Sequence, residues 1–441
     1  MKISITFAIL AVLLLWLPEK SAGKVKQMQQ RRRGWRFLAG ETFYPSYQDS
    51  MPTSLQDRKT STIFNVLNFG AKGDGRTDDT KAFEAAWLAA CKLEASTMVV
   101  PKGSVFLVKP VSFSGPNCGS NIIFQLDGKI IAPTDSRSWG SGLLQWLEFT
   151  KLNGITIRGN GVIDGQGSVW WTDAPTSTKP TAIRFYGSSD VTVTGITIQN
   201  SQQTHLKFDN CQSVQVFDIT VSSPGDSPNT DGIHLQNSQD VTIHSSKLAC
   251  GDDCVSIQTG CSGVDIQNVD CGPGHGISIG SLGKGNTKAC VSNITVRDTK
   301  IHDSLNGVRI KTWQGGSGSV RGVRFGNIQL SNVKTAIMID QYYCDGSKCR
   351  NMTSAVAVSG ISYENIRGTY SVNPVHFACS DTSPCTDVTL DTIQLQPLEE
   401  NKPPFCWNAY GQLKTTTTPP IQCLMVAKSS NKQRLNNDDS C

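Results

Sequence analysis

Three short segments, TDGIHL at 230–235, DDCVSI at 252–257 and GHGISI at 274–279, follow one another at a regular interval and decide the fold. Each places polar and small residues before an alternation of apolar and polar residues that is typical of a strand. Asp231, Asp253 and His275 are evenly spaced along the chain. If each interval forms one coil of a stacked β-structure, equivalent positions lie about 4.8 Å apart. The pattern therefore predicts two acids and a histidine in one row.

Further members of the series bring a basic pair to the same face. NGVRIK at 306–311 and TAIMI at 335–339 follow at longer intervals than the first three segments. Arg309 and Lys311 occupy alternate positions, so in a regular strand their side chains project from one face. We therefore expect both of them beside the acidic row.

A second series of alternating segments, offset from the first, recurs along most of the chain. Its members are 155–157, 191–193, 214–216, 241–243, 264–266, 294–296, 323–325, 361–363 and 388–390. Several strands in each period, separated by Gly, Asn, Asp and Ser, predict an all-β parallel β-helix whose coils share one apolar interior. A β-propeller is the main alternative, but its blades need about 40 residues each and a more regular spacing.

The segments before and after the coils predict how the solenoid begins and ends. Residues 64–67 have the pattern of a strand and 70–75 that of a loop, and a helix runs from a cap at Thr77 or Asp78 to about Cys91. Its apolar face predicts that it covers the open end of the coils. Prolines at 403–404 and 419–420 and the polar stretch 429–441 indicate the close of regular structure.

The chain divides into four parts. We interpret residues 1–23 as a signal peptide, because the apolar run at 3–17 is too short for a membrane span and small residues follow it. Residues 24–61 form a basic and polar N-terminal segment, 62–425 the β-helix, and 426–441 a polar tail. Six of the basic residues behind the net charge of +5 lie at 24–37, so the folded body gives no reason to expect a nucleic-acid partner.

Secretion has two further consequences for this sequence. Fifteen cysteines in an exported chain imply disulfides, and the odd count leaves at least one thiol unpaired within the chain. The sequons at Asn293 and Asn351 become candidate glycosylation sites.

The row of acids suggests glycosidic chemistry. Asp231, Asp252 and Asp253 place three carboxyl groups close together, so one of them should stay protonated while another is ionised. A proton donor beside a carboxylate base is the minimum apparatus for hydrolysing a glycosidic bond. A metal site is the other use of clustered acids, but His275 is a poor calcium ligand and the cysteines lack paired zinc spacing. We expect no metal.

The same segments resemble the four signature motifs of the polygalacturonases, family 28 of the glycoside hydrolases. The motifs are NTD at 229–231, GDD at 251–253, GHG at 274–276 and RIK at 309–311, in that order. The likeness runs from about residue 64 to 423 and is closest to the plant members. It implies a right-handed parallel β-helix, de-esterified homogalacturonan (pectin) as substrate, hydrolysis of α-1,4-galacturonosyl bonds with inversion, and no cofactor.

The resemblance also implies residue roles. Asp252 is expected to be the general acid, while Asp231 and Asp253 position and deprotonate the attacking water. His275 is expected to hydrogen-bond within the acid cluster and help to keep the donor protonated. Arg309 and Lys311 are expected to bind a galacturonate carboxylate.

Some details of the resemblance leave alternatives open. Tyr343 is the better match to the substrate-binding tyrosine of the family, with Tyr342 as the alternative. Cys254–Cys271 resembles a bridge of the family, and Cys344–Cys349 and Cys379–Cys385 would close short loops. Stacked carboxylates about 5 Å apart are more typical of retaining enzymes; the resemblance nevertheless favours inversion.

Two other functions fit part of the pattern. A pectate lyase would act on the same polymer but would need bound calcium and would leave unsaturated ends. A non-catalytic pectin-binding wall protein could use Arg309 and Lys311 to hold the polymer, yet it gains nothing from carboxylates in its groove. We expect a secreted, monomeric enzyme of the cell wall with pectin as its partner and no membrane association.

Overall fold

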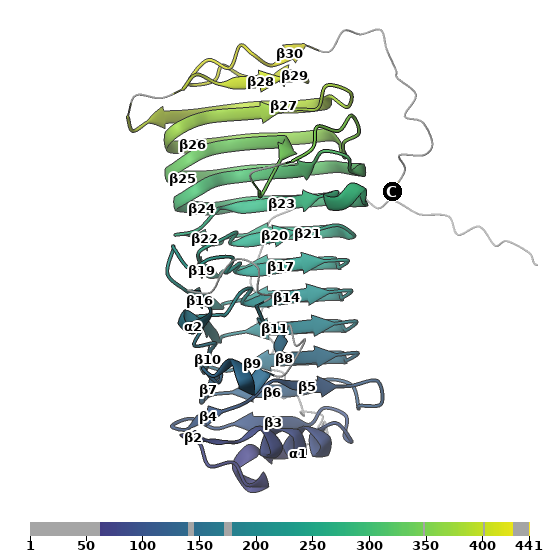
Figure 1. Cartoon of the computed structure of the whole chain (residues 1–441), viewed down its shortest axis with the longest axis vertical. Coiled ribbons are helices and arrows are strands. Elements are labelled where there is room, and N and C mark those ends of the chain that lie inside the picture. The colour runs from purple at the N-terminus through teal and green to yellow at the C-terminus, as the bar shows by residue number, and fades with distance from the viewer. Residues whose placement is uncertain (1–61, 140–144, 172–178, 347–348, 400–401, 427–440) are drawn as a thin grey trace, which may run out of the picture. The chain divides into compact units, whose positions relative to one another are not determined.

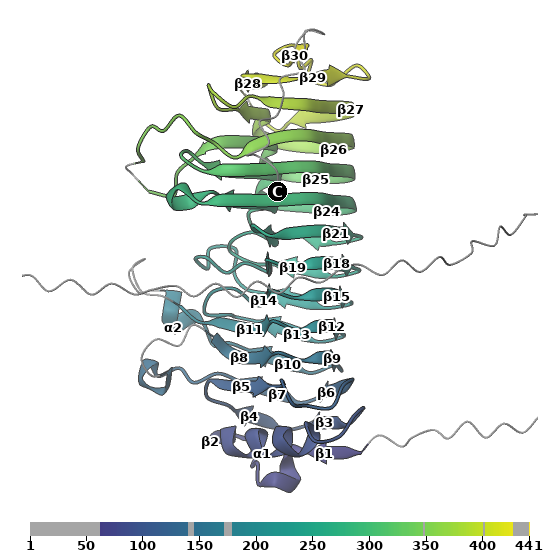
Figure 2. The same cartoon turned by 90° about the vertical axis from the view of Figure 1, so that its right-hand side faces the viewer.

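The computed structural model describes residues 62–139, 145–171, 179–346, 349–399, 402–426 and 441. In this part of the chain the strands stack as successive parallel coils, which confirms the predicted parallel β-helix (Figures 1 and 2). The predicted signal peptide and basic segment lie outside the described residues, as does nearly all of the polar tail. The division of the chain into four parts therefore stays a prediction.

Each coil contributes strands to three rows, and each strand pairs with its equivalent in the next coil. The first row contains β1 (Ile63–Asn65), β3 (Thr97–Val100), β6 (Ile122–Leu126), β9 (Asn153–Arg158), β12 (Ser189–Thr194), β15 (Gln212–Phe217), β18 (Gln239–His244) and β21 (Cys261–Gln267). The second row contains β2 (Asp74–Asp78), β4 (Val105–Leu107), β7 (Lys129–Ile131), β10 (Val162–Asp164), β13 (Thr197–Gln199), β16 (Thr220–Ser222), β19 (Lys247–Ala249) and β22 (Asp270–Cys271). The third row contains β5 (Val111–Ser114), β8 (Gln145–Thr150), β11 (Thr181–Tyr186), β14 (Leu206–Asp209), β17 (Ile233–Gln236), β20 (Val255–Ile257) and β23 (Ile277–Leu282).

Later coils are paired almost continuously, so single long strands pass through all three rows. They are β24 (Lys288–Trp313), β25 (Ser317–Tyr343) and β26 (Ala357–Ala378). The stack continues with β27 (Cys385–Pro397), β28 (Phe405–Trp407), β29 (Ala409–Leu413) and β30 (Met425–Val426). The prolines at 403–404 therefore do not end regular structure as expected, because three short strands follow them.

Alternating apolar side chains fill the interior of the coils. Phe149, Phe185 and Phe208 from successive coils stack with ring centroids 5.1 Å apart at each step. This distance is close to the strand spacing, so each ring lies above its equivalent in the coil below. The apolar residues that alternate in the sequence therefore form stacks of equivalent side chains inside the coils.

From β12 to β26, a left-handed residue turns each coil after its first-row segment. These residues are Gly195, Asp218, Ser245, Asn268, Asp298, Asn327 and Asn365. Short polar residues tolerate positive φ better than branched ones. The Asn327 amide donates to the Asp298 carboxylate at 2.9 Å, and the Asn365 amide donates to the Asn327 side-chain oxygen at 2.7 Å. These corner contacts help to hold the register from coil to coil.

The pairing beside the site is maintained where the coils grow longer, although small register shifts occur elsewhere in these strands. Ile277, Val308, Ile337 and Val375 remain paired in turn although the sequence intervals between them differ. The extra residues form loops after β23, β24 and β25, including the short helix η3 (Lys284–Asn286). Part of these loops surrounds a hollow of about 260 Å³ lined by Trp313, Tyr343 and Met352, among others.

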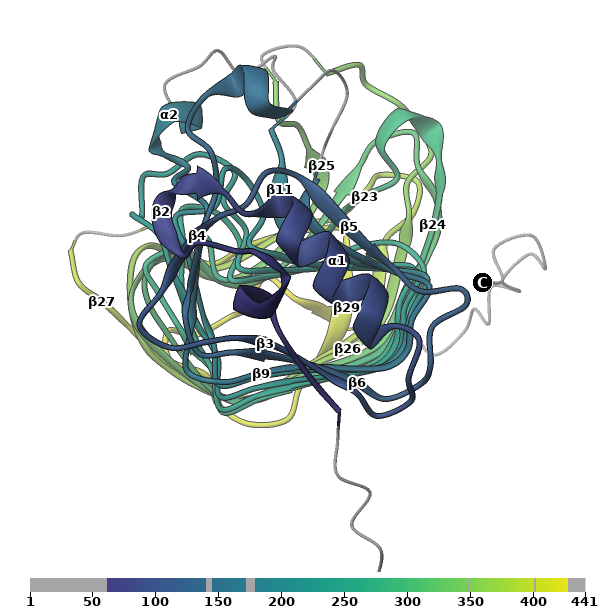
Figure 3. The ribbon, with the colours of Figure 1, turned by 90° about the horizontal axis from the view of Figure 1, so that it is seen from below.

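A helix covers the N-terminal end of the coils, as predicted, and Figure 3 shows α1 (Thr80–Ala90) lying across that end. The residues of its apolar face, Ala82, Phe83, Ala86, Trp87 and Ala90, are all buried. The predicted cap is wrong, because Asp79 occupies the N-cap position without making a side-chain cap bond. Its carboxylate instead accepts the backbone N–H groups of Lys72 and Gly73 at 2.6 and 3.2 Å.

The remaining helices are short. They are η1 (Val66–Phe69), η2 (Ser136–Trp139) and α2 (Ser168–Trp171). The strand expected at 64–67 is half right, since η1 takes over from β1 at Val66.

Six disulfides are present in the described residues. The three suggested pairs, Cys254–Cys271, Cys344–Cys349 and Cys379–Cys385, are all formed. Three others were not predicted: Cys91–Cys118, Cys290–Cys441 and Cys406–Cys423. Cys211, Cys250 and Cys261 remain as buried free thiols, which agrees with the expectation from the odd count.

Candidate active site

The third row of strands positions the site. β17, β20 and β23 pair so that Ile233, Val255 and Ile277 stand opposite one another. The backbone bonds continue before the strands, where the N–H of Gly232 donates to the Asp253 carbonyl and that of Cys254 to the Gly276 carbonyl. Asp231, Asp253 and His275 each lie just before these aligned positions, at the same offset. The structure thus brings together the row expected from the even spacing of these residues.

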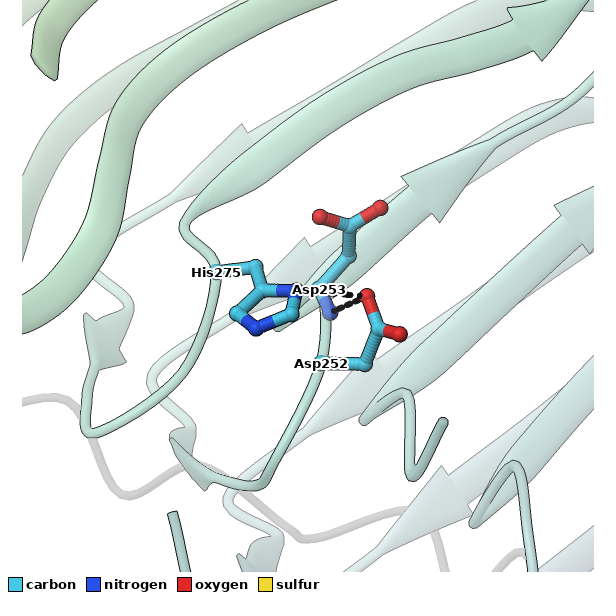
Figure 4. A group of neighbouring side chains, drawn as sticks. All are labelled: Asp252, Asp253 and His275. Atoms are coloured by element: carbon cyan, nitrogen blue, oxygen red, sulfur yellow. Dashed lines mark hydrogen bonds and ion pairs between the residues drawn. The ribbon is translucent and has the colours of Figure 1, made fainter. Parts of the chain in front are cut away.

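Asp252 and His275 form a side-chain pair at the start of adjacent coils. The Nδ1 atom of His275 lies 3.0 Å from Oδ1 of Asp252, and Figure 4 shows this contact. The same Asp252 oxygen accepts the backbone N–H of Asp253 at 2.8 Å. The backbone N–H of His275 also donates to the backbone carbonyl of Asp252 at 2.7 Å, so both backbone and side-chain contacts hold the two residues together.

Glycines allow the backbone to approach closely at these turns. A Cβ atom on Gly251 would lie 1.9 Å from the carbonyl oxygen of Ser227. Gly276 has a φ of 86°, and a Cβ there would lie 2.2 Å from the Asn306 carbonyl oxygen. A side chain at either position would push the coils apart, which explains why Gly flanks both Asp252 and His275.

Asp253 is held by two cations. Its Oδ1 accepts from Arg309 Nη2 at 2.7 Å and from the Ser278 hydroxyl at 2.8 Å, while its Oδ2 accepts from Lys311 Nζ at 2.9 Å. The Asp253 side chain is 2% exposed, and those of Arg309 and Lys311 are 8% exposed. The basic pair thus lies beside the acids as expected, but part of its charge neutralises Asp253.

Two histidines that sequence reasoning missed surround Asp231. The Nδ1 atom of His234 lies 3.2 Å from Asp231 Oδ2. Fully buried His205 contacts the Asp231 carbonyl oxygen with its backbone N–H at 2.9 Å and with its ring Nδ1 at 2.8 Å. Burial lowers the pKa of His205 to about 4, and burial together with Lys207 lowers that of His234 to about 3. Both rings are therefore neutral at ordinary pH and act through hydrogen bonds.

The pKa values of Asp231 and Asp252 move in opposite directions. Burial, followed by the charges of Asp252 and Asp253, raises the pKa of Asp231 well above its usual range. Burial opposes the ionisation of Asp252 too, but the hydrogen bond and charge of His275, with Lys311, outweigh it and lower the pKa of Asp252. In the substrate-free cluster Asp252 therefore ionises before Asp231 as the pH rises. This differs from the expectation that His275 helps to keep the Asp252 donor protonated, because its hydrogen bond and charge lower the pKa of Asp252 in the substrate-free cluster.

Tyr343 contacts the basic pair through its ring, whereas the hydroxyl of the alternative tyrosine contacts another loop. The Lys311 ammonium lies 5.3 Å from the centre of the Tyr343 ring, within cation–π range. The Tyr342 hydroxyl instead accepts the backbone N–H of Asp381 at 3.1 Å. Both tyrosines line a hollow of about 510 Å³ that also contains Arg309. A second hollow of about 410 Å³ reaches His275.

A metal ion fits this cluster poorly. Ligand atoms of Asp252, Asp253 and His275 lie within 4.8 Å of one another. However, the two oxygens of Asp253 already accept bonds from Arg309 and Lys311, so a divalent cation would have to compete with both.

Stacked carboxyl groups on a parallel β-helix, one protonated beside one ionised, define a glycoside hydrolase that uses general acid and base catalysis. The family model "Glycosyl hydrolases family 28" matches residues 91–411, and the chain therefore belongs to that family. The chain is 43% identical over 354 residues to a polygalacturonase of Persea americana, covering 78% of this chain and 76% of that protein. It is 40% identical over 384 residues to polygalacturonase-2 of Solanum lycopersicum, covering 84% and 83%.

Solved structures confirm the right-handed parallel β-helix. The endo-xylogalacturonan hydrolase of Aspergillus tubingensis superimposes with a TM-score of 0.70 at 23% identity, over 84% of this chain and 99% of that one. The polygalacturonase of Erwinia carotovora gives 0.64 at 24% identity, over 84% and 100%. None of the described helices is both long and apolar enough to span a membrane.

Proposed function

We propose that this protein is a secreted polygalacturonase that hydrolyses α-1,4-galacturonosyl bonds of de-esterified homogalacturonan with inversion. The observation that carries the proposal is the carboxyl row, formed by Asp231, Asp252 and Asp253, in a chain of family 28. Asp252 protonates the leaving oxygen, and Asp231 and Asp253 position and deprotonate the attacking water. In the tautomer that carries its proton on Nε2, His275 can accept a hydrogen bond from protonated Asp252 at Nδ1, which lies 3.0 Å from Asp252 Oδ1 and supports the acid role.

Arg309, Lys311 and Tyr343 bind the galacturonate beside the cleaved bond. The contacts to Asp253 and Ser278 use Nη2 and Nε of Arg309, so Nη1 has no partner among the described residues. Lys311 contacts Asp253 with one of its three possible donors. The pair can therefore neutralise Asp253 and still offer donors to an anionic sugar.

The enzyme acts outside the cell, on the wall polymer, as a monomer. Six disulfides support an oxidising compartment. The sequon residues Asn293 and Asn351 are both exposed, which is compatible with glycosylation.

The purified protein should release reducing ends from polygalacturonate without forming unsaturated products, and a chelator should leave the rate unchanged. The reason is that Arg309 and Lys311 already supply the positive charge that a lyase obtains from calcium. Reducing-end and ultraviolet assays, with and without chelator, provide the measurement. Ultraviolet-absorbing ends that depend on calcium would indicate a lyase, and binding without cleavage would indicate a wall-binding protein.

Activity should follow a bell-shaped pH profile with an acidic optimum. The cluster shares one proton, which the raised pKa of Asp231 retains before substrate binds and which must move to Asp252 for the acid step, so its loss as pH rises removes the donor. The lowered pKa of Asp252 places the second protonation of the cluster, which removes the base, well into the acid range. Both limbs belong to the coupled cluster. Initial rates of kcat/KM across pH test this, and a rate that keeps rising into alkaline pH would contradict it.

A further inference from the structure

A lysine lies on the outer face of the third row of strands, on the N-terminal side of the acids. Lys207 in β14 pairs in register with His234, which pairs with Ser256, then Ser278, then Arg309 in the following coils. Its strand neighbours Leu206 and Phe208 point into the core, so the Lys207 side chain projects from the outer face. This is the face on which His234, Ser278 and Arg309 contact the carboxyl row.

Lys207 differs from the other cations on this face because its charge is unpaired. Arg184 binds Glu148 at 3.2 Å and Asp209 at 2.7 Å, and Arg309 and Lys311 bind Asp253. The Lys207 ammonium forms no hydrogen bond or ion pair with any described residue, although its side chain is half-buried. Burial, outweighing the attraction of Asp209, lowers the pKa of Lys207.

A half-buried charge without a partner costs stability. Removing such a group should be neutral or stabilising unless the charge is used to bind something. The face on which it lies leads directly to the site where an anionic polymer is cut, so an anion is the ligand that would neutralise it.

We propose that Lys207 binds the carboxylate of a second galacturonate unit, on the N-terminal side of the cleaved bond. The proposal rests on the proposed function and extends it to a binding contact outside the carboxyl row. Four strand steps separate Lys207 from Arg309, or about 19 Å at the ordinary strand spacing. The carboxylate at Lys207 therefore belongs to a different sugar from the one held by Arg309 and Lys311.

The test compares Lys207→Met with wild type on de-esterified oligogalacturonides of increasing length. On long oligomers the variant should raise KM about ten-fold, the value of one charge-assisted hydrogen bond, with kcat within about twofold. On oligomers too short to reach Lys207 the KM should equal that of wild type. The variant should also unfold at the same temperature as wild type or higher, because an unpaired half-buried charge is removed.

Lys247→Met is the matched control, since Lys247 is exposed and lies in the second row, on another face. It removes the same charge and so measures the general attraction of the protein for a polyanion. Lys207→Arg should keep most of the binding because it keeps the charge.

Three outcomes would overturn the proposal. One is a KM for Lys207→Met equal to that of Lys247→Met on long oligomers; another is a loss of equal size at every length. A shifted pH profile with unchanged KM would mean that Lys207 acts through His234 and Asp231 instead. Absence of any hydrolysis by wild type would refute the proposed function, which is a separate result. If Lys207→Met folds poorly, Lys207→Gln replaces it in the same comparison.

Discussion

Replacing Asp252 by asparagine is expected to lower turnover on polygalacturonate by about 10² to 10⁴, the usual value of general acid catalysis, while the fold remains intact. Asparagine can still accept the backbone N–H of Asp253 and contact His275, so the turn keeps its hydrogen bonds. It cannot deliver a proton to the leaving oxygen. The measurement is kcat at equal concentrations of folded protein, and a turnover within threefold of wild type would refute the acid role.

Asp231→Asn is the comparison variant for the acid role. The pKa of Asp231 is raised, so Asp231 is the other carboxyl group that could donate the proton. An aryl oligogalacturonide distinguishes the general acid from the general base, because its phenolate leaving group departs without needing a proton. The variant that lacks the acid should recover much of its activity on this substrate, whereas one that lacks the base should not. Recovery by Asp231→Asn rather than by Asp252→Asn would assign the acid to Asp231.

Arg309→Met is expected to lower the free energy of unfolding by about 3 kcal/mol, in addition to weakening substrate binding. The change leaves Asp253, which is 2% exposed, with Lys311 as the one cation bound to it in the described part of the chain. A buried carboxylate deprived of one of its partners keeps its desolvation cost and loses much of the compensating attraction. Urea unfolding monitored by circular dichroism provides the measurement.

Arg324→Met is the control for this prediction. Arg324 and Glu364 lie 2.7 Å apart, as close as Arg309 and Asp253, but the Arg324 side chain is 57% exposed. Its loss should change stability by less than about 1 kcal/mol. The double variant Asp253→Asn/Arg309→Met should lose less than the sum of the two single losses. Equal losses at Arg309 and Arg324 would show that the buried pair contributes no more than a surface one.

The fold and the row of acids could be predicted from sequence because both depend on local periodicity. Alternation fixes which side chains face the core, and a constant interval fixes which positions stack from Asp231 to His275. The register then follows without any knowledge of distant contacts. In a parallel stack, residues that are one coil apart in the sequence are therefore neighbours in space.

The contacts within the site could not be predicted in the same way. Sequence placed Arg309 and Lys311 on the correct face but could not show that both reach Asp253. The roles of His205 and Ser278 depend on register with other coils, and their residue types alone carry no signal. The pKa of Asp231 moves with burial and the neighbouring carboxylates and that of Asp252 with burial and His275, and a linear pattern reveals none of these contacts.

The constant register beside variable loop length has a consequence for protein engineering. The short coil from Val255 to Ile277 and the much longer one from Ile337 to Val375 stack in the same way, so the extra residues are absorbed outside the strands. Loops after β23, β24 and β25 could therefore be exchanged between relatives as modules, while the strands continue to hold the carboxyl row in place. The length of these loops can therefore be altered in an engineered variant without altering the strands that position the catalytic residues.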